Sequence, residues 1–145
     1  FIFIPETIGA ITYINKNFQK LKSNVIGGYN ISCVGDENKF SCILSKYGDS
    51  PSDSALLETF KKFNSKFKKY SFLERGSDER QFNSPFINLG ITTICKTKFG
   101  NYKEYHTSLD DFSILFRLRV RPFLSLHVLL HLVVQDLSQI ALYFV

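Results

Sequence analysis

The chain has 145 residues, a net charge of +5, and neither tryptophan nor methionine. This length supports one domain with a buried core and excludes two. Three cysteines, Cys33, Cys42 and Cys95, have no CxxC spacing, which argues against a disulfide framework or a structural zinc knot. We therefore expect buried, neutral thiols and a reducing, cytoplasmic setting.

The chain begins with FIFIP, residues 1–5, an apolar run ended by proline that predicts a buried strand. Apolar residues then recur at helical spacing from Ile8 to Leu21, which predicts a helix that Thr7 can cap. Because the sequence starts inside a strand, we expect a fragment cut from within a sheet. Its exposed sheet edge would let copies associate as a homo-oligomer.

Two further strands are predicted over 25–34 and 39–44, joined by the turn sequence GDEN. A second helix is predicted to begin at Pro51, because Ser50 is a good cap and Asp53 follows it by three residues. Both signals are local and use residue types that satisfy the free N–H groups of a first helical turn.

Lysines alternate with aromatic residues in KKFNSKFKKY, residues 61–70, as they do in nucleic-acid-binding segments. Phe60, Phe63 and Phe67 are three and four residues apart, which is the spacing of a buried helical stripe. The pattern favours a helix whose lysines face solvent, without a nucleic-acid partner. A basic nucleic-acid-binding domain remains an alternative.

A short strand is predicted over 70–76 and a central strand over 88–95, followed by a loop over 97–108. The resulting order of strands and helices predicts an α/β fold with a mixed sheet flanked by helices. In such sheets the site forms from polar residues at strand ends and in the following loops. The residues at such places are Glu6, Asp36, 74–80 and His106.

The composition changes after Phe112. Residues 113–145 contain arginine, leucine and histidine but no lysine, asparagine or glycine. We therefore divide the chain into a partial domain, 1–112, and an atypical apolar tail that is predicted to be helical. Polar residues interrupt the apolar run of the tail, so no membrane span and no membrane partner are predicted.

Four segments, FIPETIGAI, CVGDENKFS, RGSDERQF and EYHTSLDD, follow one another at characteristic spacing. In this order the chain resembles a bacterial family of aminopeptidase-like domains of unknown function, whose genes often lie near polysaccharide-biosynthesis genes. That family is similar to zinc-dependent aminopeptidases of the co-catalytic zinc exopeptidase type. The resemblance covers residues 1–112 and implies a three-layer zinc-exopeptidase-like domain, present here as a C-terminal fragment.

The resemblance also implies a catalytic and metal-binding set. Glu6 matches the general base that activates a zinc-bound water, whereas Thr7 replaces an acidic zinc ligand. His106 matches the closing histidine ligand, and Asp36 lies near a ligand aspartate. Zinc accepts imidazole nitrogen and carboxylate oxygen, so these residue types suit the metal.

Other polar residues fit supporting roles. Ser77 and Asp78 match the start of a Ser-Asp-His motif, with Glu79 in place of its histidine. Asp78, Glu79 and Asp110 can orient a ligating imidazole or contact substrate. Arg80 can hold a substrate carboxylate or neutralise its acidic neighbours, and the neutralising role is favoured.

The resulting hypothesis is a fragment of a zinc-dependent hydrolase that acts on an amide bond near a free amino end. Its substrate would be a small peptide or another amide-bearing molecule. We expect no activity from the fragment alone, because the remaining ligands of such sites precede residue 1. Thr7 in place of a ligand supports an alternative, a non-catalytic binding module on a peptidase-like scaffold.

Overall fold

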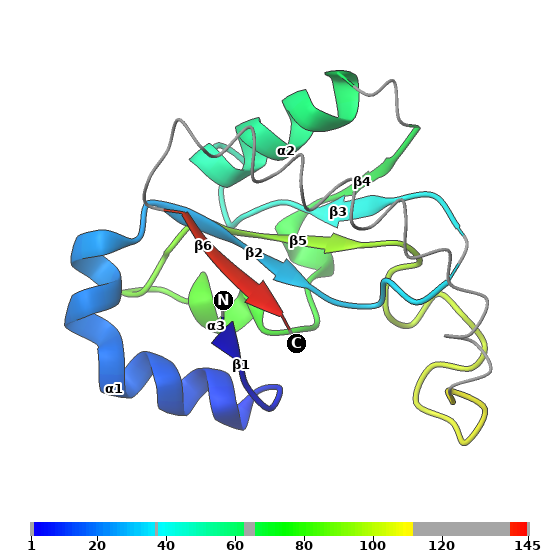
Figure 1. Cartoon of the computed structure of the whole chain (residues 1–145), viewed down its shortest axis with the longest axis horizontal. Coiled ribbons are helices and arrows are strands. Elements are labelled where there is room, and N and C mark those ends of the chain that lie inside the picture. The colour runs from blue at the N-terminus through cyan, green and yellow to red at the C-terminus, as the bar shows by residue number, and fades with distance from the viewer. Residues whose placement is uncertain (1, 37, 63–65, 112–139, 145) are drawn as a thin grey trace.

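A computed structural model describes residues 2–36, 38–62 and 66–111, and also the backbone of 140–144 (Figure 1). Within these ranges six strands form one mixed sheet in the order β1-β6-β2-β5-β3-β4. Neighbouring strands are parallel except β3 and β5, which are antiparallel. The strands are β1 (Ile2–Phe3), β2 (Gly27–Ile31), β3 (Ser41–Ile43), β4 (Lys68–Tyr70), β5 (Ile91–Cys95) and β6 (Ile140–Phe144).

Helices cover both faces of this sheet. Figure 1 shows α2 (Pro51–Lys62) on one side, and α1 (Ile8–Asn24) and α3 (Glu79–Phe82) on the other. One buried cluster joins the sheet to α2 through Leu56 and Phe60, and a second joins it to α1 and α3 through Ile14 and Phe82. The predicted mixed sheet flanked by helices is therefore confirmed, with β5 near its centre.

The start of α2 follows the sequence prediction closely. The Asp53 N–H donates to Ser50 Oγ at 3.2 Å, and the Ser50 N–H donates to Asp53 Oδ2 at 3.1 Å, which is a reciprocal capping box. Phe67 stacks on Phe60 with 4.4 Å between ring centroids. Both rings pack in the core, although Phe67 lies beyond the helix end, and Phe63 lies outside the described residues.

Besides the place of Phe67 outside the predicted helix, two further predicted features are wrong. The strand expected over 70–76 lies earlier, at Lys68–Tyr70, and a 3₁₀ turn, Phe72–Glu74, follows it. Lys68 and Lys69 are exposed on this edge strand, as charged residues often are at sheet edges, and their polarity hid the strand. The expected side-chain cap of α1 is also absent, because the Thr7 hydroxyl makes no capping hydrogen bond.

Most of the predicted helical tail lies outside the described residues. The part that is described, 140–144, is strand β6 rather than helix, and it pairs with β1 and β2. An apolar run of five residues is too short for its periodicity to separate a strand from a helix. In the described part of the chain, no helix is long and apolar enough to cross a membrane.

Candidate functional site

The turn between β1 and α1 carries the predicted general base. Glu6 is exposed there, and Thr7 follows it with a backbone φ of 61°. A β-branched residue rarely adopts this left-handed conformation, which costs on the order of 1–3 kcal/mol. The Thr7 N–H donates to Asp78 Oδ1 at 2.8 Å, so a side chain 71 residues away holds the turn.

A second hydrogen bond joins the same two segments. Ser77 is buried, and its hydroxyl donates to Glu6 Oε1 at 2.8 Å. The RGSDER loop, residues 75–80, therefore fixes both the backbone of the 6–7 turn and the carboxylate of Glu6. The fixed carboxylate lies at the surface of the molecule, where a ligand can reach it.

Asp78 is the least satisfied carboxylate of this region. The residue is 0% exposed, and among the described residues nothing donates a hydrogen bond to its Oδ2. Burial raises the pKa of Asp78, and the nearby charges of Glu6 and Glu79 raise it further. The Thr7 N–H and the charge of Arg80 act in the opposite direction on this pKa.

The Glu79 side chain points into the sheet, and hydrogen bonds hold both of its carboxylate oxygens there. It is fully buried, and its Oε1 accepts the N–H groups of Gly76 at 2.9 Å and Ser77 at 3.2 Å. Its Oε2 accepts hydrogen bonds from Asn30 Nδ2 at 3.0 Å and Thr93 Oγ1 at 2.9 Å. Glu79 therefore anchors the loop to β2 and β5 rather than facing solvent.

Sequence reasoning missed the partners of Glu79. Asn30 and Thr93 are fully buried polar residues in the middle of β2 and β5. The signal was present, because Asn30 interrupts β2 with a polar side chain, and Thr93 together with Thr92 does so in β5. Buried polar groups need hydrogen-bonding partners, so such interruptions mark places where another polar side chain enters the core.

Arg80 is exposed and makes no ion pair with a described carboxylate. Its Nε donates to Gln81 Oε1 at 3.2 Å, and in the described ranges Lys103–Glu104 is the one ion pair found. Arg80 lowers the pKa of Asp78 through space but makes no direct ion pair with it. The favoured neutralising role is thus limited to this long-range effect.

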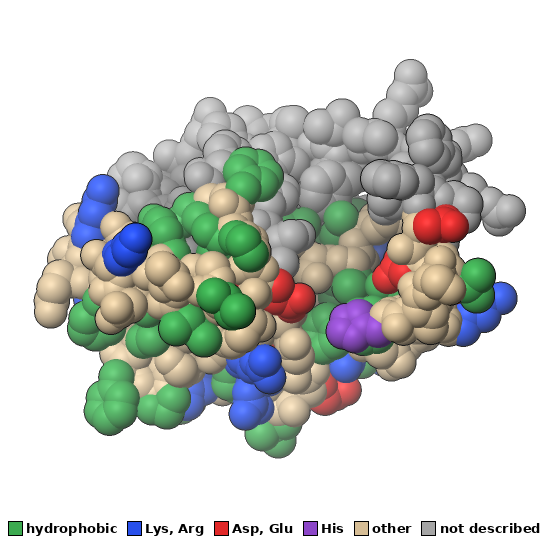
Figure 2. Space-filling model, turned by 90° about the horizontal axis from the view of Figure 1, so that it is seen from below, with side chains coloured by type: hydrophobic (Ala, Val, Ile, Leu, Met, Phe, Trp, Pro, Cys, Tyr) green, Lys and Arg blue, Asp and Glu red, His purple; other side chains and the backbone are tan. Residues whose placement is uncertain are grey.

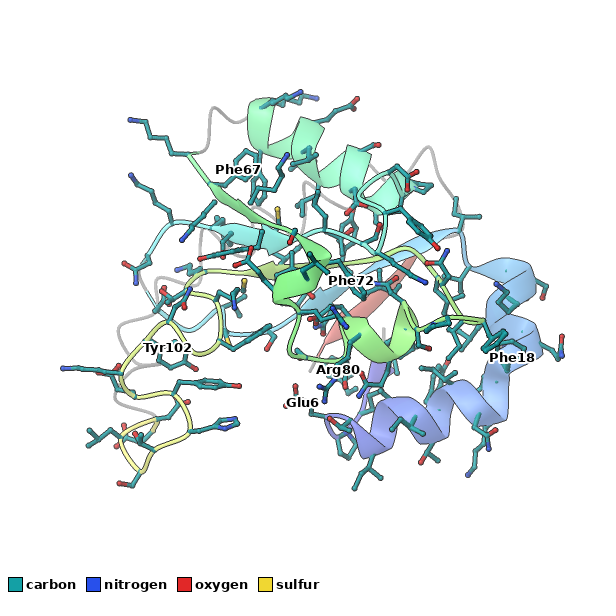
Figure 3. The ribbon with its side chains drawn as sticks, turned by 180° about the vertical axis from the view of Figure 1, so that it is seen from behind. Glu6, Phe18, Phe67, Phe72, Arg80 and Tyr102 are labelled. Carbon is teal, nitrogen blue, oxygen red and sulfur yellow. The ribbon has the colours of Figure 1, made fainter. Side chains whose placement is uncertain are left out.

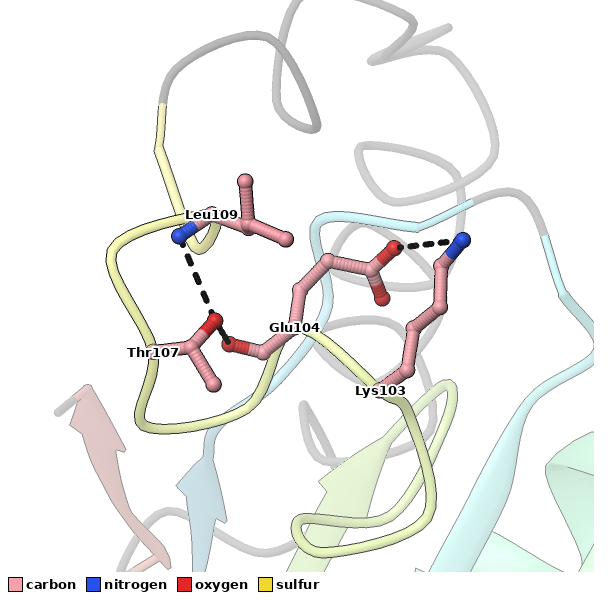
Figure 4. A network of polar contacts seen from close by, with 4 residues as sticks. All are labelled: Lys103, Glu104, Thr107 and Leu109. Atoms are coloured by element: carbon pink, nitrogen blue, oxygen red, sulfur yellow. Dashed lines mark hydrogen bonds and ion pairs between the residues drawn. The ribbon is translucent and has the colours of Figure 1, made fainter.

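The predicted loop around His106 is a chain of turns. Thr107 Oγ1 donates to the carbonyl of Glu104 at 2.7 Å and accepts the Leu109 N–H at 3.2 Å, while Lys103 pairs with Glu104 at 3.6 Å (Figure 4). Such short-range bonds shape the loop without tying it to the sheet. The backbone that carries the rings of Tyr105 and His106 is therefore held by hydrogen bonds within the loop.

His106 is exposed and has a φ of 58°, and its imidazole is the purple side chain in Figure 2. Its ring stacks on Tyr105 with 4.0 Å between centroids. Burial raises the pKa of the Tyr105 phenol, and the charge of Glu6 raises it further. The RGSDER loop thus reaches Glu6 by a hydrogen bond, and the His106 loop lies within electrostatic range of it.

Asp36 and Asp110 already have protein partners. Asp36 accepts the N–H groups of Asn38 at 2.8 Å and Thr97 at 2.9 Å, so it braces two loops together. Asp110 accepts a hydrogen bond from the Tyr102 hydroxyl at 3.3 Å. A metal-binding role for Asp36 and a supporting role for Asp110 stay predictions.

No three His, Cys, Asp or Glu side chains of the described residues lie close enough together to hold one metal ion. Zinc sites in proteins use at least three protein ligands, so these residues do not complete such a site by themselves. Burial raises the pKa of the Cys42 thiol to about 12 and of the Cys95 thiol to about 11. All three cysteines are free, and these two are buried and neutral, as predicted.

Comparison with known proteins assigns the chain to a family. A family profile described as "Domain of unknown function (DUF4910)" matches residues 1–133. The chain belongs to the DUF4910 family. The match runs past residue 112, where the resemblance was expected to end.

A protein of Clostridium acetobutylicum named "Putative polysaccharide biosynthesis protein with aminopeptidase-like domain" is 39% identical to the DUF4910 chain over 111 residues. The match covers 77% of this chain and 25% of that relative. A crystal structure of a "putative peptidase" from the same organism superposes with a TM-score of 0.76 at 33% identity. It covers 93% of this chain and 31% of the other.

The expected resemblance to aminopeptidase-like domains is therefore confirmed, and the DUF4910 chain has a peptidase-like scaffold. The chain spans about a quarter of the length of the curated relative and about a third of the solved structure.

Proposed function

We propose that this DUF4910 domain is part of an amide hydrolase that cleaves an amide bond near a free amino end, with Glu6 as general base. The hydrogen bond from Ser77 to Glu6 carries the proposal. A general base needs a fixed orientation and access to the water that it deprotonates. Glu6 has both, because one oxygen is held by a buried hydroxyl while the side chain stays exposed.

The surrounding residues suit this role. Asp78 holds the backbone next to Glu6, and Glu79 holds the loop that carries Ser77 and Asp78. The proposed base is thus positioned by buried side chains of segment 77–79, which Glu79 in turn joins to β2 and β5. The free, buried thiols also fit a reducing compartment such as the cytoplasm.

Zinc and the zinc-exopeptidase type belong to the same proposal. His106 would supply an imidazole, and zinc, when bound, would lower the pKa of a bound water. The described residues hold no three-ligand group, so further donors are needed for tight binding. We therefore expect this chain alone to bind zinc weakly and to hydrolyse nothing.

Catalysis is best tested in the longer Clostridium acetobutylicum relative. Replacing the relative's residue that aligns with Glu6 by glutamine should lower the hydrolysis rate of alanine p-nitroanilide at least about 100-fold, because a general base contributes that much or more. Glutamine keeps the acceptor for the serine hydroxyl, so folding should be unchanged. An unaltered rate would remove Glu6 from catalysis.

Metal binding is tested in this chain by mass spectrometry after equilibration with zinc. His106→Ala should lower the bound zinc, and Lys103→Ala, an exposed change in the same loop that removes no zinc donor, should leave it unchanged. Equal zinc in all three proteins would exclude His106 as a ligand without bearing on Glu6.

A second function is favoured by Thr7. Its hydroxyl stands where the resemblance expects an acidic ligand, and a neutral hydroxyl is a poor zinc donor. The scaffold would then recognise an amide-bearing ligand without cleaving it. Zinc in the relative, without turnover of any aminoacyl amide, would support this binding module over the hydrolase.

A further inference from the structure

A groove of about 1050 Å³ lies between α1 and the segment around α3. Among the described residues, its walls carry three cations, Lys16, Lys20 and Arg80, and no aspartate or glutamate. Pockets of this size accommodate small organic ligands. A concave surface lined by one sign of charge concentrates ligands of the opposite sign.

Arg80 is the cation best prepared to bind a ligand. Its Nε is used by Gln81, and no described carboxylate lies within ion-pair distance of its guanidinium. Asp78 and Glu79, its neighbours in sequence, point to the Thr7 backbone and into the sheet. The planar fork of Arg80 is therefore available for a carboxylate, which it can bind through two parallel hydrogen bonds.

The groove begins beside the proposed general base. Figure 3 shows Arg80 and Glu6 at the same end of α1, with Phe18 at the other end. The Ile11 N–H bonds the Thr7 carbonyl, so the first lining residue of α1 is one turn from the Glu6 turn. From Ile11 to Lys20 the groove follows the helix for about 14 Å, at 1.5 Å a residue.

The floor of the groove is partly apolar. Ile11 is 53% exposed, and two other apolar lining residues, Phe18 and Ile87, are half-buried. Figure 2 looks onto the α1 side of the molecule and shows hydrophobic side chains interspersed with lysine or arginine. Asn15 and Gln81 add amide groups that both donate and accept. A complementary ligand has short apolar or methylene parts, amide or hydroxyl groups, and negative charge.

We propose that this groove holds the acidic part of the substrate, a small molecule with a free amino group near Glu6 and one or two carboxylates beyond its amide bond. The inference rests on the proposed function and names the substrate class for the same site. A second copy of this chain would be a poor occupant of the cationic groove, because the chain itself has a net charge of +5. The 113–145 segment, with three arginines and one aspartate, is also cationic.

Binding to this chain is measured by calorimetry at low ionic strength with the peptide Ala-Glu-Glu and its uncharged counterpart, Ala-Gln-Gln amide. The acidic peptide should bind at least about tenfold more tightly, since charge-assisted hydrogen bonds exceed neutral ones in strength. Arg80→Gln should remove most of this preference. Lys61→Gln makes the same charge change on α2, across the sheet, and should leave the affinity within about twofold.

Lys20→Gln is a second groove variant, on the exposed face of α1, and should weaken binding of the acidic peptide by a smaller factor. Equal affinity for the two peptides, no binding of either, or equal loss in Arg80→Gln and Lys61→Gln would overturn the proposal. Binding of polyglutamate alone would also overturn it, because it would indicate a surface for acidic polymers.

The two proposals fail in different ways. Charge-selective binding that depends on Arg80, together with no hydrolysis by the longer relative, would retain the groove and remove the catalytic role. Hydrolysis that depends on the Glu6 position, with no preference for acidic peptides, would retain the hydrolase and remove the substrate class.

Discussion

Two buried aspartates, Asp53 and Asp78, are only 1% and 0% exposed but differ sharply in their surroundings. Asp53, at the start of α2, accepts five hydrogen bonds from backbone and hydroxyl groups of Ser45, Ser50 and Thr92. Asp78, in the RGSDER loop, accepts one from Thr7, and its second oxygen has no donor among the described residues.

We interpret the difference as separating a residue that stabilises the fold, Asp53, from one that belongs to the proposed site, Asp78. Burying a charged group costs free energy unless hydrogen bonds replace its water. Asp53 recovers that cost locally, whereas Asp78 does not, and a strained Thr7 lies next to it. Locally unfavourable arrangements of this kind gather at functional sites.

The largest effect is expected from Asp53→Asn. The amide NH₂ would face serine and threonine donors, leaving buried donors without an acceptor, so the free energy of unfolding should fall by about 3 kcal/mol. Urea unfolding at pH 7 measures this loss. Asp49→Asn is an exposed control in the same turn and should cost less than about 0.5 kcal/mol. Similar stabilities for both variants would refute the structural role of Asp53.

Gly76→Ala tests how tightly the RGSDER loop is held. An added Cβ would overlap Phe99 Cε2, and Phe99 packs with Ile43 and Tyr70. The overpacking should cost about 2 kcal/mol. Adding Phe99→Leu should recover part of that loss, because a shorter side chain relieves the clash. No recovery in thermal unfolding of the double variant would contradict the packing explanation.

Asp78→Asn should behave in the opposite way from Asp53→Asn. Asparagine can still accept the Thr7 N–H, and it removes a poorly solvated charge, so stability at pH 7 should be unchanged or higher by up to about 1 kcal/mol. A loss comparable to that of Asp53→Asn would abolish the contrast between the two aspartates.

The pH dependence of the same variant sharpens the comparison. The raised pKa of Asp78 means that the folded state holds the proton more tightly than the unfolded state, where the ordinary value is 3.8. Its stabilising contribution is therefore complete below that value and is lost as pH rises through the folded pKa. Urea unfolding at pH 4 and pH 7 should show this loss in the parent chain and not in Asp78→Asn.

Ser77→Ala should have the smallest effect on stability. It removes one hydrogen bond to an exposed carboxylate, and such bonds contribute on the order of 0.5–1 kcal/mol. Glu6→Gln retains the acceptor and should change the free energy of unfolding by less. A loss above about 2 kcal/mol for Ser77→Ala would assign the hydroxyl to the core rather than to the positioning of Glu6.

Local features of the fold could be predicted from the sequence, whereas long-range polar pairs could not. The capping box of Ser50 and Asp53 is readable because its two members are three residues apart. The bond between Thr7 and Asp78 spans 71 residues, and that between Asn30 and Glu79 spans 49, so neither is visible before the sheet order is known.

The candidate site was predicted through the resemblance of its motifs to aminopeptidase-like domains. That route named Glu6, Asp78, Glu79 and His106, and their roles stay predictions. It did not foresee that Glu79 is buried against Asn30 and Thr93. Residue type indicated that these side chains could do site chemistry. Only their burial and partners separated the anchor, Glu79, from the exposed proposed base, Glu6.

The most direct test of this account is a carboxyl-carbon NMR titration of Asp78 in the folded chain. The unsatisfied, buried carboxylate next to Glu6 and Glu79 should titrate above its ordinary pKa of 3.8. Asp78→Asn identifies the resonance by its disappearance. A pKa at or below 3.8 would show that Asp78 is as well satisfied as a structural carboxylate, and would contradict the assignment of the RGSDER loop to a functional site.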